Sequence, residues 1–127
     1  MTITDIIASV TIVLLPFWLL IPDTTLICGT DVWGVYFDNK IYVCKWDEYF
    51  MFYKYHEIGH HFYTKISVEQ KKEYNKLYST ATDYYDDYSK TDVEEDFANN
   101  FSALQLKQNQ KPNIQKRIRL IKKFMQQ

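Results

Sequence analysis

The chain has 127 residues, enough for one domain with a hydrophobic core and too few for a separate regulatory domain. Hydrophobic residues make up 46% and charged residues 24%, which is the composition of a folded protein rather than a disordered one. The net charge of -1 gives no global case for nucleic-acid binding, so we expect no nucleic-acid partner. Acidic residues are concentrated between Asp83 and Asp96 and basic residues from Lys111 onwards, which we interpret as an acidic loop and a solvated helix face.

The first element is an uncharged apolar run from Ile6 to Pro22. It is short for a transmembrane helix, which needs about 20 residues, and Pro16 would kink it. A secretory signal fits poorly, because no Lys or Arg precedes the run and no small-residue cleavage site follows it. The run is therefore either a membrane anchor or a buried helix that covers a sheet. We favour the anchor and a membrane-associated location, with a cytoplasmic location as the alternative, and we divide the chain into segment 1–23 and domain 24–127.

The next region, residues 24–43, is rich in β-forming residues. Two such runs flank the turn-like tripeptide Asp38-Asn39-Lys40, so we expect a hairpin over Trp33 to Val43. From Asp47 to about Thr64, aromatic residues recur at spacings of three and four, which predicts a helix.

The rest of the chain is predicted to form three more helices around one polar loop. Ser67 is placed to cap a helix that continues to Leu77, and residues 80–90 are the loop. Thr91-x-x-Glu94 has the pattern of a capping box at the start of a helix that runs to about residue 108. Pro112 suits the first turn of the last helix.

The clearest chemical signal is His56-Glu57-Ile58-Gly59-His60 in the first predicted helix. Residues four apart share a helical face, so the two imidazoles can hold one tetrahedral Zn²⁺. Zinc lowers the pKa of a bound water from about 15.7 to about 7, and Glu57 is placed to take the proton and pass it to a leaving amine. Gly59 costs about 1 kcal/mol relative to Ala in a helix, and its missing side chain lets another backbone come close.

A third protein ligand has to come from elsewhere in the chain. The last remaining histidine, His61, points the wrong way around the helix, so we expect it at the surface or in a supporting role. A metzincin would have Gly at position 63 and His at position 66, and Tyr63 and Ile66 exclude that class. The third ligand is therefore a carboxylate or a cysteine.

The carboxylate candidates lie between Glu94 and Leu104. With His-Glu-Ile-Gly-His, the later pattern Glu-x-x-Ala-Asn-x-Phe-small resembles the gluzincins, and most of all the compact peptidases of the ImmA/IrrE type and minimal single-domain gluzincins. The resemblance covers about residues 33–106. It implies that Glu95 is the third zinc ligand and that Asn99 supports a ligand histidine. It also implies that a substrate strand binds along the edge of the hairpin above the metal helix.

The choice between Glu94 and Glu95 has two sides in the sequence itself. On a helical wheel Glu94 lies nearer to the bulky apolar stripe, but Thr91 would engage it as a capping-box partner. Glu95 shares a stripe with the small residues Ala98 and Ser102, which would let its helix approach the metal helix near Gly59. We favour Glu95.

These observations predict an α+β, zincin-like domain with a small antiparallel sheet, a metal-binding helix and a glutamate helix. The predicted function is zinc-dependent hydrolysis of a peptide or protein substrate, with His56, His60 and Glu95 as zinc ligands and Glu57 as general base. Two alternatives stay open: a regulator of the ImmA/IrrE type that acts on a partner repressor, and a metal-stabilised binding module without activity. A structural site needs no base, which disfavours the binding module.

The transition state of peptide hydrolysis also needs an oxyanion donor besides the metal. Three tyrosines of the acidic loop are candidates, and nothing in the sequence selects one of them: Tyr84, Tyr85 and Tyr88.

Overall fold

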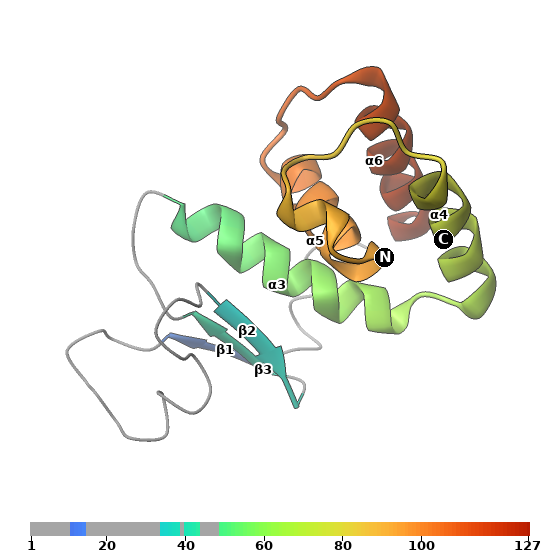
Figure 1. Ribbon diagram of the computed structural model, residues 1–127. Coiled ribbons are helices and arrows are strands. Elements are labelled where there is room, and N and C mark those ends of the chain that lie inside the picture. The colour runs from blue at the N-terminus through green and yellow to red at the C-terminus, as the bar shows by residue number, and fades with distance from the viewer. Residues whose placement is uncertain (1–10, 15–33, 39, 44–48) are drawn as a thin grey trace.

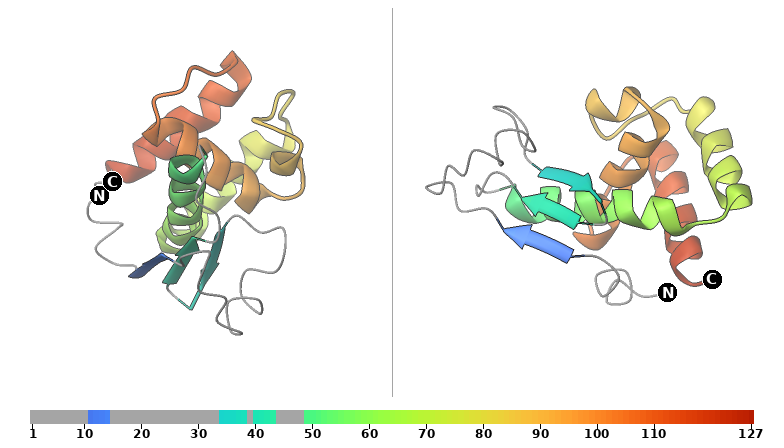
Figure 2. Two further views of the ribbon diagram at one scale, coloured as in Figure 1. Left: turned by 90° about the vertical axis from the view of Figure 1, so that its left-hand side faces the viewer. Right: turned by 90° about the horizontal axis from the view of Figure 1, so that it is seen from below.

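The computed structural model describes residues 11–14, 34–38, 40–43 and 49–127 (Figure 1). Its elements in chain order are β1 (Thr11–Leu14), β2 (Gly34–Phe37), β3 (Lys40–Val43), α3 (Phe50–Lys65), α4 (Val68–Ser79), the 3-10 turn η1 (Tyr88–Lys90), α5 (Val93–Gln105) and α6 (Pro112–Met125). The strands lie along one side of α3, and α5 packs on its other side with α4 and α6 beyond (Figures 1 and 2).

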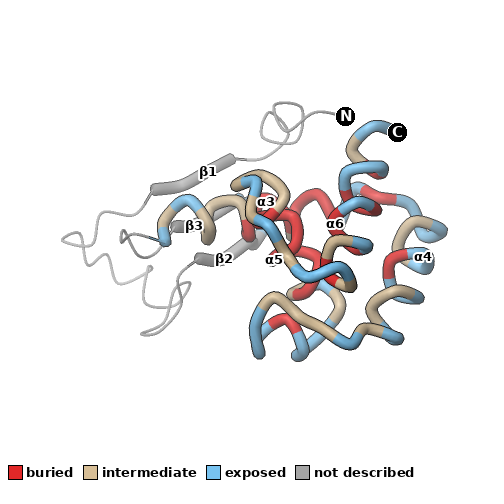
Figure 3. The backbone as a smooth tube through the Cα atoms, turned by 90° about the horizontal axis from the view of Figure 1, so that it is seen from above, coloured by how far each residue is buried: buried red, intermediate tan, exposed pale blue. Residues whose placement is uncertain are grey.

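The core forms where α3, α5 and α6 meet, and Figure 3 shows buried residues gathered there. Phe62 of α3 lies between two rings of α5, with ring centroids 6.0 Å from Phe97 and 5.8 Å from Phe101. Ile121 and Phe124 of α6 belong to the same cluster. Burial of side chains of this size stabilises a fold by about 1.5–3 kcal/mol each. This core fixes α5 against α3, and these two helices carry the residues singled out in the sequence.

Local sequence signals set most of the helix ends. Ser67 accepts a hydrogen bond from the Gln70 N–H, and the Gln70 side chain accepts one from the Ser67 N–H, which completes a capping box at the start of α4. Pro112 is the first residue of α6. Both predicted starts are confirmed.

The predicted capping box at Thr91 is wrong by one residue. Asp92 is the N-cap of α5, and its carboxylate accepts a hydrogen bond from the Glu95 N–H at 2.9 Å. The Thr91 hydroxyl donates instead to the Tyr88 carbonyl at 2.7 Å. Thr and Asp both suit the N-cap position. Thr91 follows the η1 turn in a helical conformation, whereas Asp92 has the extended conformation that an N-cap usually adopts.

The predicted fold class, an α+β domain with a small antiparallel sheet, is also wrong. The long continuous part of the described chain, residues 49–127, consists of helices and connections and contains no strand. The strands β1, β2 and β3 have four residues each, and their sheet is mixed, because β3 pairs antiparallel with β2 and parallel with β1. Helix packing therefore dominates the described structure, and the predicted hairpin, present as β2 and β3, is a minor part of it.

The strand β1 falls inside the apolar run that was predicted to be an anchor or a buried helix. Thr11–Leu14 is extended and pairs with β3, so neither helical interpretation holds for these four residues. A parallel strand reads as a continuous apolar run, and such a run cannot be told from a helix by periodicity. The remainder of Ile6 to Pro22 lies outside the described residues. Within the described residues, no helix is long and apolar enough to span a bilayer.

The basic face of α6 is solvated, as predicted, except at Arg117. This side chain is 1% exposed and forms a buried ion pair with Asp96, with its Nε 2.9 Å from Oδ2. Asp96 also accepts a hydrogen bond from the Tyr74 hydroxyl at 2.6 Å. The acidic segment, residues 80–92, is tied to α6 by the same arginine, which donates to the Asp83 carbonyl at 2.7 Å.

Candidate metal centre

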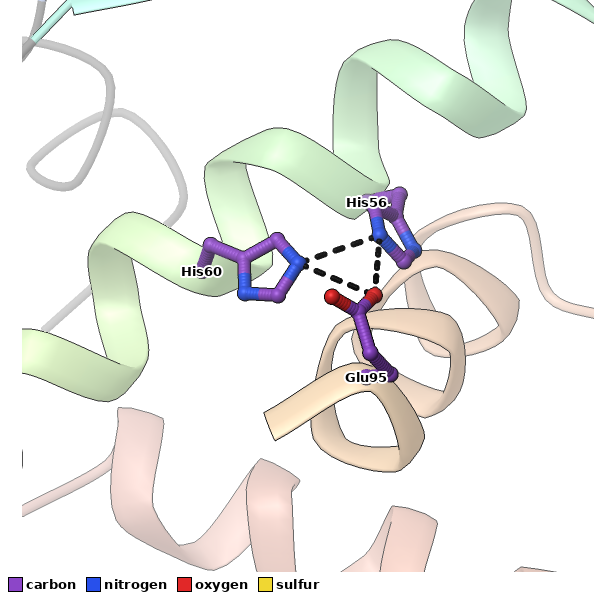
Figure 4. Close-up of side chains that lie close together, drawn as sticks. All are labelled: His56, His60 and Glu95. Atoms are coloured by element: carbon purple, nitrogen blue, oxygen red, sulfur yellow. Dashed lines mark hydrogen bonds and ion pairs between the residues drawn. The ribbon is translucent and has the colours of Figure 1, made fainter. Parts of the chain in front are cut away.

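Three of the predicted site residues come together between α3 and α5 (Figure 4). His56 and His60 project from one face of α3, and their Nε2 atoms are 3.1 Å apart. The Glu95 Oε2 atom, from the first turn of α5, is 3.0 Å from the Nε2 of His56 and 3.2 Å from that of His60. The two nitrogens and the oxygen therefore form a small triangle.

Gly59 explains how α5 can bring a carboxylate so close to α3. A Cβ atom at Gly59 would lie 3.0 Å from the Ala98 Cα and 3.0 Å from the Phe101 Cβ, which is tighter than ordinary packing. The predicted close approach of a second backbone at Gly59 is confirmed. The two helices pack here because both contribute a small residue at the crossing.

A hydrogen-bond network determines which nitrogen of His56 carries its proton. The Asn99 amide nitrogen lies 3.0 Å from the Asp86 Oδ1, and a carboxylate oxygen only accepts, so this atom is the amide NH₂. The Asn99 Oδ1 must then face the His56 Nδ1, 2.7 Å away, and only an Nδ1–H can donate to it. In its neutral form, His56 then carries its lone pair on Nε2, which points into the triangle.

The donor set fits a zinc ion. Ligand atoms about 2.0–2.2 Å from a tetrahedral zinc lie about 3.3–3.6 Å from one another, close to the separations of 3.0–3.2 Å in the triangle. A single proton can be shared between only two of the three atoms at a time. A single cation at the centre can bind a lone pair from each of the three atoms. Two imidazoles and one carboxylate are also a known set for zinc with an open fourth position.

The charges of the site are coupled. Burial disfavours the charged form of Glu95, but hydrogen bonds from His56 and His60 outweigh it and hold the pKa of this carboxyl below its usual range. Burial also disfavours the charged form of His60, yet the hydrogen bond to Glu95 and the charge of Glu57 raise its pKa. Among the described residues, no Lys or Arg forms an ion pair with Glu95. Within the described part, the ion-pair partners of this carboxylate are therefore the imidazoles of His56 and His60.

Two further groups border the triangle. Glu57 is 7% exposed, and its negative charge acts on both His60 and Tyr88. Tyr88 lies against the site, with its ring centroid 6.2 Å from that of His56 and close enough to Glu95 for the carboxylate to act on its hydroxyl. Burial, together with the nearby carboxylates, raises the pKa of Tyr88 to about 12, so its hydroxyl stays protonated at neutral pH.

The structure separates Tyr88 from the other two tyrosine candidates. Tyr85 stacks on Phe52 at 5.0 Å between ring centroids and donates its hydroxyl to Gln108. Tyr84 packs its ring under the Arg117 guanidinium, 5.5 Å away. Both have structural contacts of their own, and Tyr88 is the tyrosine that reaches the triangle.

The remaining sequence candidates lie away from the triangle. Glu94 is exposed at the surface of α5, so the structure places Glu95 rather than Glu94 at the site. Of the two roles expected for His61, the surface position is wrong, because His61 is fully buried on the core-facing side of α3. Sequence reasoning missed Asp86 and Ser89, which hold Asn99 in place, because no periodic pattern links an irregular segment to a helix.

Comparisons with protein-family models, with curated proteins and with solved structures find no match to this chain.

Proposed function

We propose that the protein is a zinc-dependent peptidase with a His-His-Glu ligand set of the gluzincin type. The observation that carries the proposal is the convergence of His56, His60 and Glu95 on one point. Glu57 follows His56 in α3, and its negative charge acts on His60. A purely structural zinc site is closed, with four protein ligands. Here the described residues offer three, and the side chains of His60 and Glu95 keep 16% and 17% of their exposure.

The residues around the triangle suit peptide hydrolysis. A zinc ion held by His56, His60 and Glu95 supplies Lewis acidity and activates a water at neutral pH. Glu57 accepts the proton of the attacking water and returns it to the leaving amine, a role worth about 10²–10⁴-fold in rate. Tyr88, protonated and half exposed at the rim, donates a hydrogen bond to the oxyanion that develops on the substrate carbonyl.

The test combines metal analysis with peptide cleavage. We expect the purified wild-type chain to bind one zinc per molecule and to cleave peptides in a mixed library, with loss of cleavage when a chelator removes the metal. Glu57→Gln should keep the zinc and lose about 10²–10⁴-fold in turnover. Glu69→Gln, an exposed acid at the start of α4, is the matched control and should behave as wild type.

Three results would contradict the proposal in different ways. A wild-type chain without zinc would remove the metal centre. Zinc binding with no cleavage of any peptide would favour the metal-stabilised binding module. A Glu57→Gln variant with near-normal turnover would show that another group is the base.

A further inference from the structure

The Asn99 side chain is a switchable contact at the metal centre. A primary amide presents an acceptor oxygen on one side and a donor nitrogen on the other. With the oxygen toward His56, the imidazole keeps its proton on Nδ1 and leaves Nε2 open. With the amide turned over, the NH₂ would face Nδ1, the proton would move to Nε2, and His56 could not serve as a ligand through that atom.

Two residues of the acidic segment contact the nitrogen of this amide. Asn99 Nδ2 donates to the Ser89 Oγ at 2.9 Å and to the Asp86 Oδ1 at 3.0 Å. Ser89 is fully buried, and its backbone N–H donates to the same Asp86 oxygen at 2.9 Å. These contacts form a closed network behind His56, on the side away from the triangle.

The two residues act differently because their groups differ. The Ser89 hydroxyl can donate or accept, so it fixes where the amide lies without deciding its orientation. The Asp86 carboxylate can only accept, and it therefore requires the amide nitrogen on its side. We propose that Asp86 is a positioning residue that, through Asn99, keeps His56 in the tautomer able to bind a metal.

The acidic segment is anchored well enough to serve this purpose. The Asn113 Oδ1 of α6 accepts hydrogen bonds from the Thr82 and Asp83 N–H groups at 3.0 and 3.2 Å. Arg117 donates to the Asp83 carbonyl, three residues before Asp86. Asp86 is thus held between α6 and η1, although its own side chain lies at the surface.

The decisive variant is Asp86→Asn, which keeps the shape of the side chain and allows it to donate as well as accept. In the metal-free chain, long-range ¹⁵N–¹H correlation spectra report which nitrogen of each imidazole is protonated, and there are three histidines to assign. We expect the Nδ1–H form of His56 in the wild type and a mixture of both forms in Asp86→Asn. Zinc affinity, measured by competition with a chromophoric chelator, should fall about 10-fold, the lower end for a group that supports a ligand.

The matched control is Asp87→Asn, which removes the same charge one residue away. The Asp87 side chain is 99% exposed and contacts Lys90 rather than Asn99, so this variant should keep the wild-type tautomer and affinity. Exchanging the two residue types between positions 86 and 99 tests whether zinc affinity can be restored. Asn99→Asp alone places two carboxylates against each other and should weaken zinc binding. Asp86→Asn combined with Asn99→Asp restores one donor and one acceptor and should recover most of the affinity.

The inference concerns the same site as the proposed function and rests on it for its purpose, but the tautomer is read without metal or activity. A His56 that stays in the Nδ1–H form in Asp86→Asn, with unchanged zinc affinity, would overturn the role of Asp86. Failure of the exchange variant to improve on Asn99→Asp would also overturn it. If the tautomer of His56 differs between the wild type and Asp86→Asn but the wild-type chain binds no zinc, the proposed function is wrong and the role of Asp86 in orienting Asn99 is supported.

Discussion

Helix α5 carries two acid–amide pairs side by side, Glu95 with Asn99 and Asp96 with Asn100, and the two pairs have different surroundings. Each acid precedes its amide by four residues, so both pairs follow one helical turn. A shift of one residue rotates a side chain by about 100°. The first pair consequently faces α3 and the acidic segment, and the second faces Tyr74 and α6.

The two carboxylates differ in what balances their charge. Asp96 is fully buried and bound by the Arg117 guanidinium, whose Nε and Nη2 lie 2.9 and 3.3 Å from its two oxygens. Burial still raises the pKa of Asp96, against the opposing effects of Tyr74 and Arg117. Glu95 is only part-buried, and its Oε2 lies 3.0 Å and 3.2 Å from the Nε2 atoms of His56 and His60.

Asp96 is therefore a carboxylate paired within the fold, whereas Glu95 is the carboxylate for which we propose a metal ion as partner. Asp96 completes an ion pair that joins α5 to α6, so its removal should lower the free energy of unfolding. Glu95 belongs to the triangle with His56 and His60 that we propose as a metal site, so its removal should lower the affinity for metal. Each substitution below tests whether the two roles separate in this way.

The largest effect on stability is expected from Asp96→Asn. The variant keeps the shape of the side chain but leaves a buried guanidinium without its counter-charge, which typically costs about 3–5 kcal/mol. Urea unfolding of the zinc-loaded chain measures the loss. The double variant Asp96→Asn with Arg117→Met should lose clearly less than the sum of the single variants, because it removes both charges. Additive losses would show that the two residues do not act as a pair.

The largest effect on metal binding is expected from Glu95→Gln. Loss of a ligand should lower zinc affinity by more than the 10–100-fold that a supporting group is worth. The stability of the metal-free chain should change little, since the Glu95 carboxylate is part-buried and, among the described residues, pairs with the imidazoles of His56 and His60 but with no Lys or Arg. Chelator competition measures the zinc affinity, and unfolding of the metal-free chain measures its stability. A variant that binds zinc normally would leave Cys44 or a carboxylate of the acidic segment as the third ligand.

Gly59→Ala should lower both the stability and the zinc affinity, each by less than the variants above. Alanine favours a helix by about 1 kcal/mol over glycine, but overpacking costs about 1–3 kcal/mol, and here the contact is to the backbone of Ala98. We expect a net loss of about 0–2 kcal/mol and a weaker zinc site, because α5 must move away from α3. Gly59→Ser should have a larger effect in the same direction. An alanine variant with increased stability and normal zinc affinity would show that the crossing has room.

Local sequence patterns predicted much of the candidate site. The spacing of four between His56 and His60 fixes a shared helical face, and Gly59 marks the place where a second backbone approaches. The choice of Glu95 rested on the small residues on one stripe of α5, on a capping role for Glu94 and on the register that the gluzincin resemblance implies, and the structure has this carboxylate in the triangle. Such features lie within one or two turns of a helix, where periodicity is informative.

Contacts between distant segments were not predictable in the same way. Nothing in the run around Thr11–Leu14 shows that it pairs in parallel with β3, since an apolar run suits a strand or a helix equally. The contact of Asp86 with Asn99 depends on the path of an irregular segment. Arg117 did carry a signal, because it lies three residues after Ile114 and four before Ile121 on the apolar stripe of α6, but its charge was grouped with the solvated lysines.

The smallest expected effects separate the two adjacent residues Asp92 and Glu94. The sequence placed the helix cap at Thr91 with Glu94 as its partner, whereas the structure has Asp92 as the cap and Glu94 exposed. Asp92→Ala should therefore cost about 0.5–2 kcal/mol, the usual value of an N-cap. Because the Asp92 carboxylate binds the N–H of Glu95 itself, this loss should be accompanied by a slightly weaker zinc site. Glu94→Ala should stay within about 0.5 kcal/mol of wild type and keep its zinc, as surface substitutions do. Thermal unfolding with and without zinc measures both variants. If Glu94→Ala were the more destabilised of the two, the cap would lie at Thr91 after all, and the first turn of α5, with Glu95 in it, would have to be shifted by one residue.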